Sequence, residues 1–228
     1  SEAATDEVRE KIALFTNVRL AAVVALPDLD TIYKVPLVLH EAGLDSNICE
    51  LLNIWTREPD VSCWREIVAS QANPRQRVRV AMVGKYVDLA ESYKSLTEAL
   101  THGGIKHETG VDVEYVDAQL VETEGADKVL AGYEGVLIPG GFGQRGSEGK
   151  IASVRWARES GVPFLGICLG MQMAVVEFAR HVAGLSSASG GEFDTDSEQK
   201  VIDIMRDQEA VTDMGGTMRL GAYDCDLE

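Results

Sequence analysis

From Val78 onward, short apolar runs that end near glycine alternate with longer amphipathic segments. Residues 78–84 (VRVAMVG) form the first such run, and residues 89–104 carry apolar side chains at helical spacing before a glycine pair that begins at Gly103. Such runs are typical of buried strands, and the glycine pair predicts the end of a helix. This alternation constrains the fold most, because strands separated by helices join by right-handed crossovers. We therefore predict an α/β domain with a doubly wound, mostly parallel sheet over residues 78–228.

The rest of this domain follows the same alternation. Strands are predicted at residues 111–118, 135–143 (running into a glycine-rich loop), 163–168 and 200–205. Helices are predicted at residues 125–133, 149–160 and 169–184, with a loop at 186–199. One side of the last helix is predicted to hold Met171, Ala174, Val175 and Phe178. Sites in such sheets lie at the carboxyl ends of the strands, where the sequences PGGFG and GICLG both fall.

Residues 1–55 provide too little material for a core of their own, so we expect them to be the C-terminal piece of a second α/β domain. Two apolar runs are predicted as buried strands and two further segments as helices, the first closed by Gly43: residues 11–18, 21–28, 32–44 and 45–54. Residues 56–77 are polar, contain two prolines and have a helical middle. They are predicted to be a linker.

The charge and the cysteines exclude several classes of protein. A net charge of −16 argues against nucleic acid as the main partner. The four cysteines lack CxxC spacing, so neither a metal site nor a disulfide framework is indicated. The acidic N-terminal segment is no signal peptide, and no apolar run approaches the ~20 residues that span a bilayer. We expect a cytoplasmic protein with reduced thiols.

Cys168 stands between two glycines at the predicted corner between strand and helix. A side chain at such a turn is exposed and strained, as in the GxSxG nucleophile elbow. The glycines allow a tight turn, the helix N-terminus favours the thiolate, and the N–H of Leu169 points toward a developing oxyanion. The alternative is a buried cysteine that acts as a small hydrophobe.

Residues 138–143 (IPGGFG) supply the other half of an oxyanion site. A glycine pair after a strand can present backbone N–H groups to an anion, although the same sequence also suits an ordinary turn between a strand and a helix. Two glycine-rich strand ends in neighbouring units, one of them holding a cysteine, favour nucleophilic chemistry.

The sequences PGGFG, GICLGMQ, GEFD and GGTMRLG resemble the class I, triad-type glutamine amidotransferase family. Further matches, VGKYVDLAESYKSL, GGFGQRGSEGK, EFARHVAGL and the upstream LPDLDTIYKVPLVLHEAGLD, resemble the CTP synthase family more narrowly. The similarity runs from about Lys11 to Asp224. It implies that residues 1–55 end a synthetase (amidoligase) domain and that residues 78–228 are an amidotransferase domain that is incomplete at its C-terminal end.

The resemblance implies a role for each matched residue. Cys168 corresponds to the nucleophile that attacks the glutamine amide, and Gly141 and Leu169 to the backbone donors of the oxyanion hole. Glutamine would be bound by Gly141, Gln172 and Glu192, with the Glu192 carboxylate facing the α-ammonium group. Two glycines precede Glu192 where the family has a bulkier pair, which puts the geometry of this loop in question.

The family also binds GTP as an allosteric activator near a loop that QRGSEG resembles. Candidates for this site are Arg145, Glu148, Tyr86 and Lys94. For Arg145 the alternative of a solvated loop arginine has equal weight.

A cysteine amidotransferase needs a histidine base and an acid that orients it. In the resembling family both lie in a motif downstream of GGTMRLG, and none of the four histidines here stands in such a motif: His40, His102, His107 and His181. We therefore expect an internal piece of a longer enzyme that is inactive when isolated.

The resemblance implies an enzyme that aminates UTP to CTP with ATP, Mg²⁺ and ammonia released from glutamine. The ATP and Mg²⁺ sites would lie mostly outside this chain, which holds no metal site of its own, and the enzyme would be a homo-oligomer, a tetramer in the family. Two alternatives remain: a non-catalytic interaction or regulatory module, and the amidotransferase part of another biosynthetic enzyme.

Overall fold

The computed structural model describes residues 4–85, 93–141, 143–191 and 197–203. The chain divides into two compact units. The first comprises Ser1–Arg77 and Thr101–Gly110, and the second comprises Val78–Leu100 and Val111–Glu228. The division into a synthetase piece, a linker and an amidotransferase domain stays a prediction.

The first unit is built mainly from helices. Its first helix, α1 (Asp6–Thr16), begins after Thr5, whose hydroxyl accepts the N–H of Val8, and ends at Asn17 in the left-handed conformation. Two short 3-10 turns and three helices follow: η1 (Leu20–Ala22), η2 (Ile32–Lys34), α2 (Val35–Glu41), α3 (Leu44–Leu51) and α4 (Ser62–Ala72). Gly43 separates α2 from α3 with a φ of +74°, and α4 is the helical middle of the predicted linker. The helices predicted in this part are confirmed.

The two strands predicted in the first unit are wrong. Residues 11–18 fall mostly in α1, and residues 21–28 contain part of η1 and otherwise no regular element. Short apolar runs fit a strand and a helix equally well. Here the Thr5 cap, with Asp6 and Glu7 in the first turn, favours the helix.

The second unit contains a four-stranded sheet in the order β2-β1-β3-β4. Its strands are β1 (Gln76–Gly84), β2 (Thr109–Asp117), β3 (Gly135–Ile138) and β4 (Phe164–Gly166). The pairs β1–β3 and β3–β4 are parallel, with Met82 opposite Leu137 and Ile138 opposite Gly166. This register places the ends of β3 and β4 side by side.

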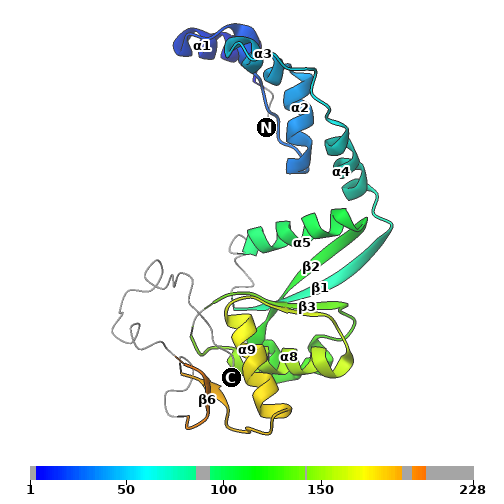
Figure 1. Ribbon diagram of the computed structural model, residues 1–228, viewed down its shortest axis with the longest axis vertical. Helices are drawn as coiled ribbons and strands as arrows, with labels where there is room; N and C mark the ends of the chain where they lie inside the picture. The colour runs from blue at the N-terminus through cyan, green and yellow to red at the C-terminus, as the bar shows by residue number, and fades with distance from the viewer. Residues whose placement is uncertain (1–3, 86–92, 142, 192–196, 204–228) are drawn as a thin grey trace. The chain divides into compact units, whose positions relative to one another are not determined.

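Helices cover both faces of the sheet (Figure 1). On one face, Leu96 and Leu100 of α5 (Lys94–Lys106) pack with Met82 and Leu137. The opposite face carries four helices: α6 (Ala118–Glu124), α7 (Ala126–Val129), α8 (Ser147–Ser160) and α9 (Leu169–His181). Neighbouring residues of a strand point to opposite faces. Ala81 and Val83 of β1 therefore belong to the core on the side of these four helices, whereas Met82 faces α5. The predicted doubly wound α/β fold is confirmed.

Details of this unit differ from the prediction. Helix α5 continues through Gly103 to Lys106, because a glycine inside a helix costs only about 1 kcal/mol relative to alanine. Helix α6 was not predicted, and the predicted loop at 186–199 contains β5 (Ser189–Gly190), which pairs in parallel with β6 (Lys200–Ile202). The strand predicted at 200–205 is confirmed over Lys200–Ile202, Asp203 lies outside it, and residues 204 and 205 are outside the described residues.

Helix α9 buries a different face from the one that its apolar stripe suggests. Leu169, Met173 and Val176 are buried in the core, whereas Met171 and Phe178 are 51% and 55% exposed. The two faces are equally apolar, so periodicity alone does not choose between them. Across the described residues, no helix combines the length and the apolar character that crossing a membrane requires.

Candidate active site

Cys168 occupies the corner between β4 and α9, as predicted. It is the N-cap residue of α9, it is exposed, and its backbone has φ +53° and ψ −108°. This region is sparsely populated by residues other than glycine, and strain of this kind gathers at functional sites. The helix N-terminus next to the thiol stabilises negative charge. The corner therefore presents a thiol as a nucleophile elbow does.

The glycines on either side of Cys168 are required by close packing. A Cβ on Gly170 would lie 2.1 Å from the carbonyl oxygen of Ile138, and one on Gly166 would lie 2.5 Å from the carbonyl carbon of Gly170. Such separations are too short for real atoms, so only glycine fits at either position. Because both positions are glycine, the turn at Cys168 can pack closely against Ile138 at the end of β3.

The glycine pair after β3 lies against the elbow. A Cβ built on Gly140 would be 3.5 Å from the Cβ of Cys168, and one on Gly141 would be 3.5 Å from a methyl carbon of Leu169. The N–H of Ile167 donates to the carbonyl of Ile138 at 3.0 Å and ties the two segments together. Two backbone segments thus flank the thiol, and the first N–H groups of α9 have no acceptor within the helix.

Of the predicted glutamine-binding residues, the structure brings Gly141 and Gln172 close to the elbow. The N–H of Gln172, in the first turn of α9, donates to the carbonyl of Cys168 at 3.1 Å. The side chain of Gln172 is half-buried. Glu192 lies outside the described residues.

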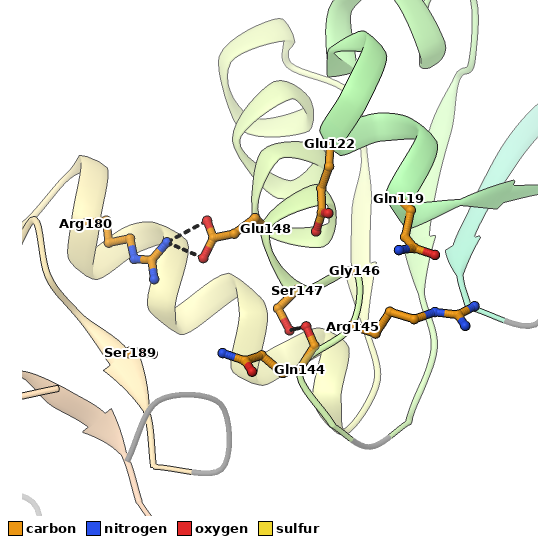
Figure 2. A pocket seen from close by; sticks show the side chains of 9 residues that line it. All are labelled: Gln119, Glu122, Gln144, Arg145, Gly146, Ser147, Glu148, Arg180 and Ser189. Carbon is orange, nitrogen blue, oxygen red and sulfur yellow. Dashed lines mark hydrogen bonds and ion pairs between the residues drawn. The ribbon is translucent and has the colours of Figure 1, made fainter. Parts of the chain in front are cut away.

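A polar cavity of about 490 Å³ opens at the N-terminus of α8 (Figure 2). It is lined by Gln119, Glu122, Gln144, Arg145, Gly146, Ser147, Glu148, Arg180 and Ser189. The Arg145 guanidinium donates to the carbonyl of Lys85 at 3.4 Å, whereas the Glu148 carboxylate is paired with Arg180. Lys94 is the first residue of α5, and Tyr86 lies outside the described residues. The cavity thus gathers two of the four residues predicted to bind the activator.

Two charged residues near this cavity were not predicted. Glu122 accepts the N–H of Gly149 at 3.0 Å, in the first turn of α8. Lys150, the next residue, is only 2% exposed. Burial, and then the charge of Lys85, lower the pKa of Lys150 to about 8, while Glu122 opposes the shift. The sequence does not indicate that Lys150 is buried, because a lysine in an amphipathic helix is ordinarily expected on the exposed face.

Within the described part of the second unit, no histidine lies beside Cys168. In the second unit, His181 lies thirteen residues after Cys168 at the far end of α9, about 20 Å away at 1.5 Å per residue. Its ring nitrogen lies 3.3 Å from a carboxylate oxygen of Glu177. The other three histidines belong to the first unit: His40, His102 and His107. Likewise, no cluster of His, Cys, Asp or Glu able to hold a metal ion was found within the described part of the chain.

Comparisons with known proteins agree with this geometry. A family model described as "Glutamine amidotransferase class-I" matches residues 88–227, and one described as "CTP synthase N-terminus" matches residues 1–54. The chain is 51% identical to a CTP synthase of Syntrophus aciditrophicus (strain SB) over 98% of its own length and 41% of that protein. It is 52% identical to a CTP synthase of Geotalea uraniireducens (strain Rf4), over 97% of its length and 42% of that protein.

A solved structure also matches the fold. It is the glutaminase domain of Trypanosoma brucei CTPS with bound acivicin, and it superposes with a TM-score of 0.54 and 41% sequence identity. The match covers 57% of this chain and 51% of that one. The chain itself spans about two fifths of the length of the curated relatives.

Proposed function

Because the chain belongs to the class I glutamine amidotransferase family, we propose that Cys168 hydrolyses glutamine and that the ammonia is used to make CTP from UTP. The observation that carries this proposal is the elbow: Cys168 has a φ of +53° at the N-cap of α9, directly against Gly140. The relatives described as CTP synthases support the second half of the proposal.

In the proposed reaction, the Cys168 thiolate attacks the side-chain amide carbon of glutamine. The N–H groups of Gly141 and Leu169 bind the oxyanion that forms, as backbone donors do in other acyl transfers. The C–N bond then breaks, the nitrogen takes up a proton and leaves as ammonia, and a glutamyl thioester remains on Cys168. Water hydrolyses the thioester to glutamate and frees the thiol.

Three assignments complete the glutaminase site. Gln172 and Gly141 hold the polar end of glutamine, and the Glu192 carboxylate faces its α-ammonium group. The histidine that takes the thiol proton, and the acid that orients it, are expected downstream of GGTMRLG.

Residues 1–54 would contribute to the synthetase half of the enzyme, where ATP phosphorylates the 4-oxygen of UTP and ammonia displaces the phosphate. The match to the N-terminal family model supports this assignment and separates the chain from amidotransferases that serve other biosynthetic reactions. ATP and Mg²⁺ would be held mostly by other parts of the enzyme. We propose a cytoplasmic homo-oligomer, a tetramer, with no nucleic acid or membrane partner.

GTP is the proposed activator, and Arg145, Tyr86 and Lys94 are its proposed contacts. The cavity at the N-terminus of α8 supports a site for a polar ligand beside Arg145. Glu148 was predicted with this group, but its carboxylate is already paired with Arg180 at 2.9 Å. Arg145 is therefore the better supported of the two loop residues.

The test is Cys168→Ala in a full-length enzyme that carries this chain. The thiol is needed only to release ammonia, so CTP formation from glutamine is expected to fall by about 10³-fold or more, as after loss of other catalytic nucleophiles, while formation from added ammonium salts persists. Absorbance of CTP with each nitrogen donor gives both rates. Loss of both activities in a folded protein contradicts the two-site scheme, and retention of both contradicts Cys168 as the nucleophile.

A further inference from the structure

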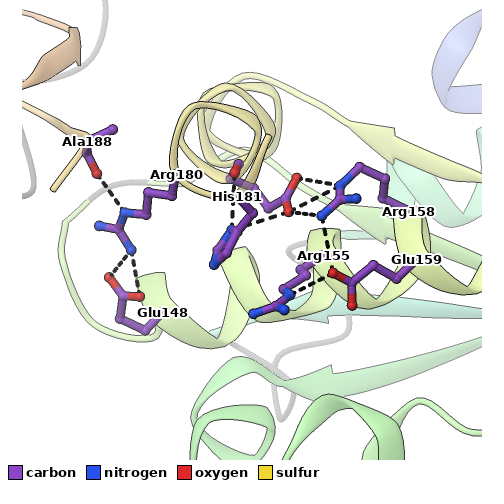
Figure 3. Close-up of polar contacts among 8 residues, drawn as sticks. Glu148, Arg155, Arg158, Glu159, Arg180, His181 and Ala188 are labelled. Atoms are coloured by element: carbon purple, nitrogen blue, oxygen red, sulfur yellow. Dashed lines mark hydrogen bonds and ion pairs between the residues drawn. The ribbon is translucent and has the colours of Figure 1, made fainter. Parts of the chain in front are cut away.

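Arg180, in the last turn of α9, contacts two other segments of the second unit (Figure 3). One guanidinium nitrogen donates to both carboxylate oxygens of Glu148, at 3.0 and 2.9 Å. The Nε donates to the carbonyl of Ala188 at 2.6 Å. The Arg180 side chain is 20% exposed and that of Glu148 is 65% exposed, so the arginine is largely shielded from water while the carboxylate is not. Arg180 thereby joins α9 to the first turn of α8 and to the segment that leads into β5.

A second ion pair joins the same two helices at the other end of α8. Arg158 donates to the carboxylate of Glu177 at 2.7 Å, and Glu177 is only 1% exposed. Glu177 precedes Arg180 by three residues, which is about one helical turn. Figure 3 shows the pair of Arg180 and Glu148 where α9 crosses α8. One turn of α9 therefore holds α8 at both of its ends.

The two helices that these ion pairs join, α8 and α9, each follow one half of the candidate active site. Helix α9 begins directly after Cys168, and α8 begins six residues after Gly140–Gly141. A shift of the first turn of α8 would displace the glycine pair relative to the thiol. Oxyanion donors act only when they are held in place before the reaction, and small displacements reduce the rate strongly.

We infer that Arg180 is a positioning residue for glutamine hydrolysis and that Glu148 acts through Arg180 rather than on a bound nucleotide. The inference rests on the proposed glutaminase function. Both oxygens of Glu148 already accept from one nitrogen of Arg180, and charge-assisted hydrogen bonds are stronger than neutral ones. A ligand at Glu148 would have to break this pair.

The experiment uses the full-length enzyme with Arg180→Met, with Glu148→Gln, and with both changes. Initial rates of glutamine hydrolysis give kcat and KM, with and without GTP, and kcat is divided by the fraction of Cys168 that iodoacetamide titrates in the folded protein. This correction removes any loss due to unfolding. Glu148→Gln changes an exposed side chain, so it keeps the test valid if Arg180→Met folds poorly.

The expected result is a fall in kcat of about tenfold with KM for glutamine unchanged, because oxyanion donors stabilise the transition state more than the bound substrate. The fall should be the same with and without GTP. The double variant should be no slower than Arg180→Met alone, because Arg180→Met already removes the contact that Glu148→Gln weakens. Rates with ammonium salts should not change.

Arg155→Met and Glu159→Gln serve as the matched control. Of the two, Arg155→Met alone is the decisive control: it removes an ion pair of similar length, 2.9 Å, between exposed side chains of α8 without changing a partner of Arg158, and it should leave kcat and KM unaltered. A rate loss confined to assays with GTP, additive losses in the double variant, or a rise in KM alone would overturn the inference. Failure of the proposed function would be seen separately, as glutamine hydrolysis that survives Cys168→Ala.

Discussion

At the scale of the residue, the conformation of Cys168 is the feature most closely tied to function. A φ of +53° with ψ −108° suits glycine and costs other residues about 1–3 kcal/mol. The chain keeps a cysteine there, beside a helix N-terminus and close to Gly140, where an added Cβ would lie 3.5 Å from the Cβ of Cys168. The protein therefore keeps a strained backbone at the position of the thiol, as expected where the folded state gives up some stability for a reactive group.

Replacing Cys168 by glycine should make the chain more stable than replacing it by alanine. Both variants lose the thiol, but only glycine relieves the left-handed strain, so Cys168→Gly should unfold with a free energy about 1 kcal/mol higher than Cys168→Ala. Urea denaturation of the two variants measures this difference. Equal stabilities, or a less stable glycine variant, would show that the elbow is not strained.

At the scale of the element, two helical glycines of the same chain have opposite environments. Gly170, in the first turn of α9, has the carbonyl of Ile138 where a Cβ would be. Gly103, inside α5, would meet nothing within 4 Å. The first glycine is required by packing against β3. The second only weakens its helix.

Alanine at these two glycines should therefore change stability in opposite directions. Gly170→Ala is expected to lower the free energy of unfolding by about 2 kcal/mol, because the elbow must move away from β3. Gly103→Ala is expected to raise it by about 0.5–1 kcal/mol, the usual gain inside a helix. Urea midpoints of both variants check the pair. A Gly170→Ala variant as stable as the parent chain would mean that the elbow does not rest on β3.

The same elements show how far the sequence predicts the structure. The strands and helices after Val78 were largely predictable, because most of these segments have a glycine at one end and match one period. The buried side of α9 was not predictable, since Met173 and Phe178 are both apolar and only packing on α8 and on the strands distinguishes them. The strand expected over residues 11–18 failed for a related reason, because local capping selected a helix.

At the scale of the whole molecule, the candidate site is assembled from segments that are distant in sequence but end at one edge of the sheet. Cys168 and Gly141 were predictable, because parallel strands place their carboxyl ends together. The link from Arg180 to Glu148 was not, since it depends on how α9 crosses α8. Glutamine binding by Glu192 and nucleotide binding by Tyr86 stay predictions.

The central claim is that Cys168 is the nucleophile for glutamine, and covalent labelling tests it most directly. A full-length enzyme carrying this chain would be treated with an electrophilic glutamine analogue, followed by peptide mapping, with the exposed Cys63 as the internal control. We predict a label on Cys168 alone, formed in proportion to the loss of glutamine hydrolysis and prevented by excess glutamine. Loss of hydrolysis with the label on Cys63 or Cys49, and Cys168 unmodified, would contradict the claim.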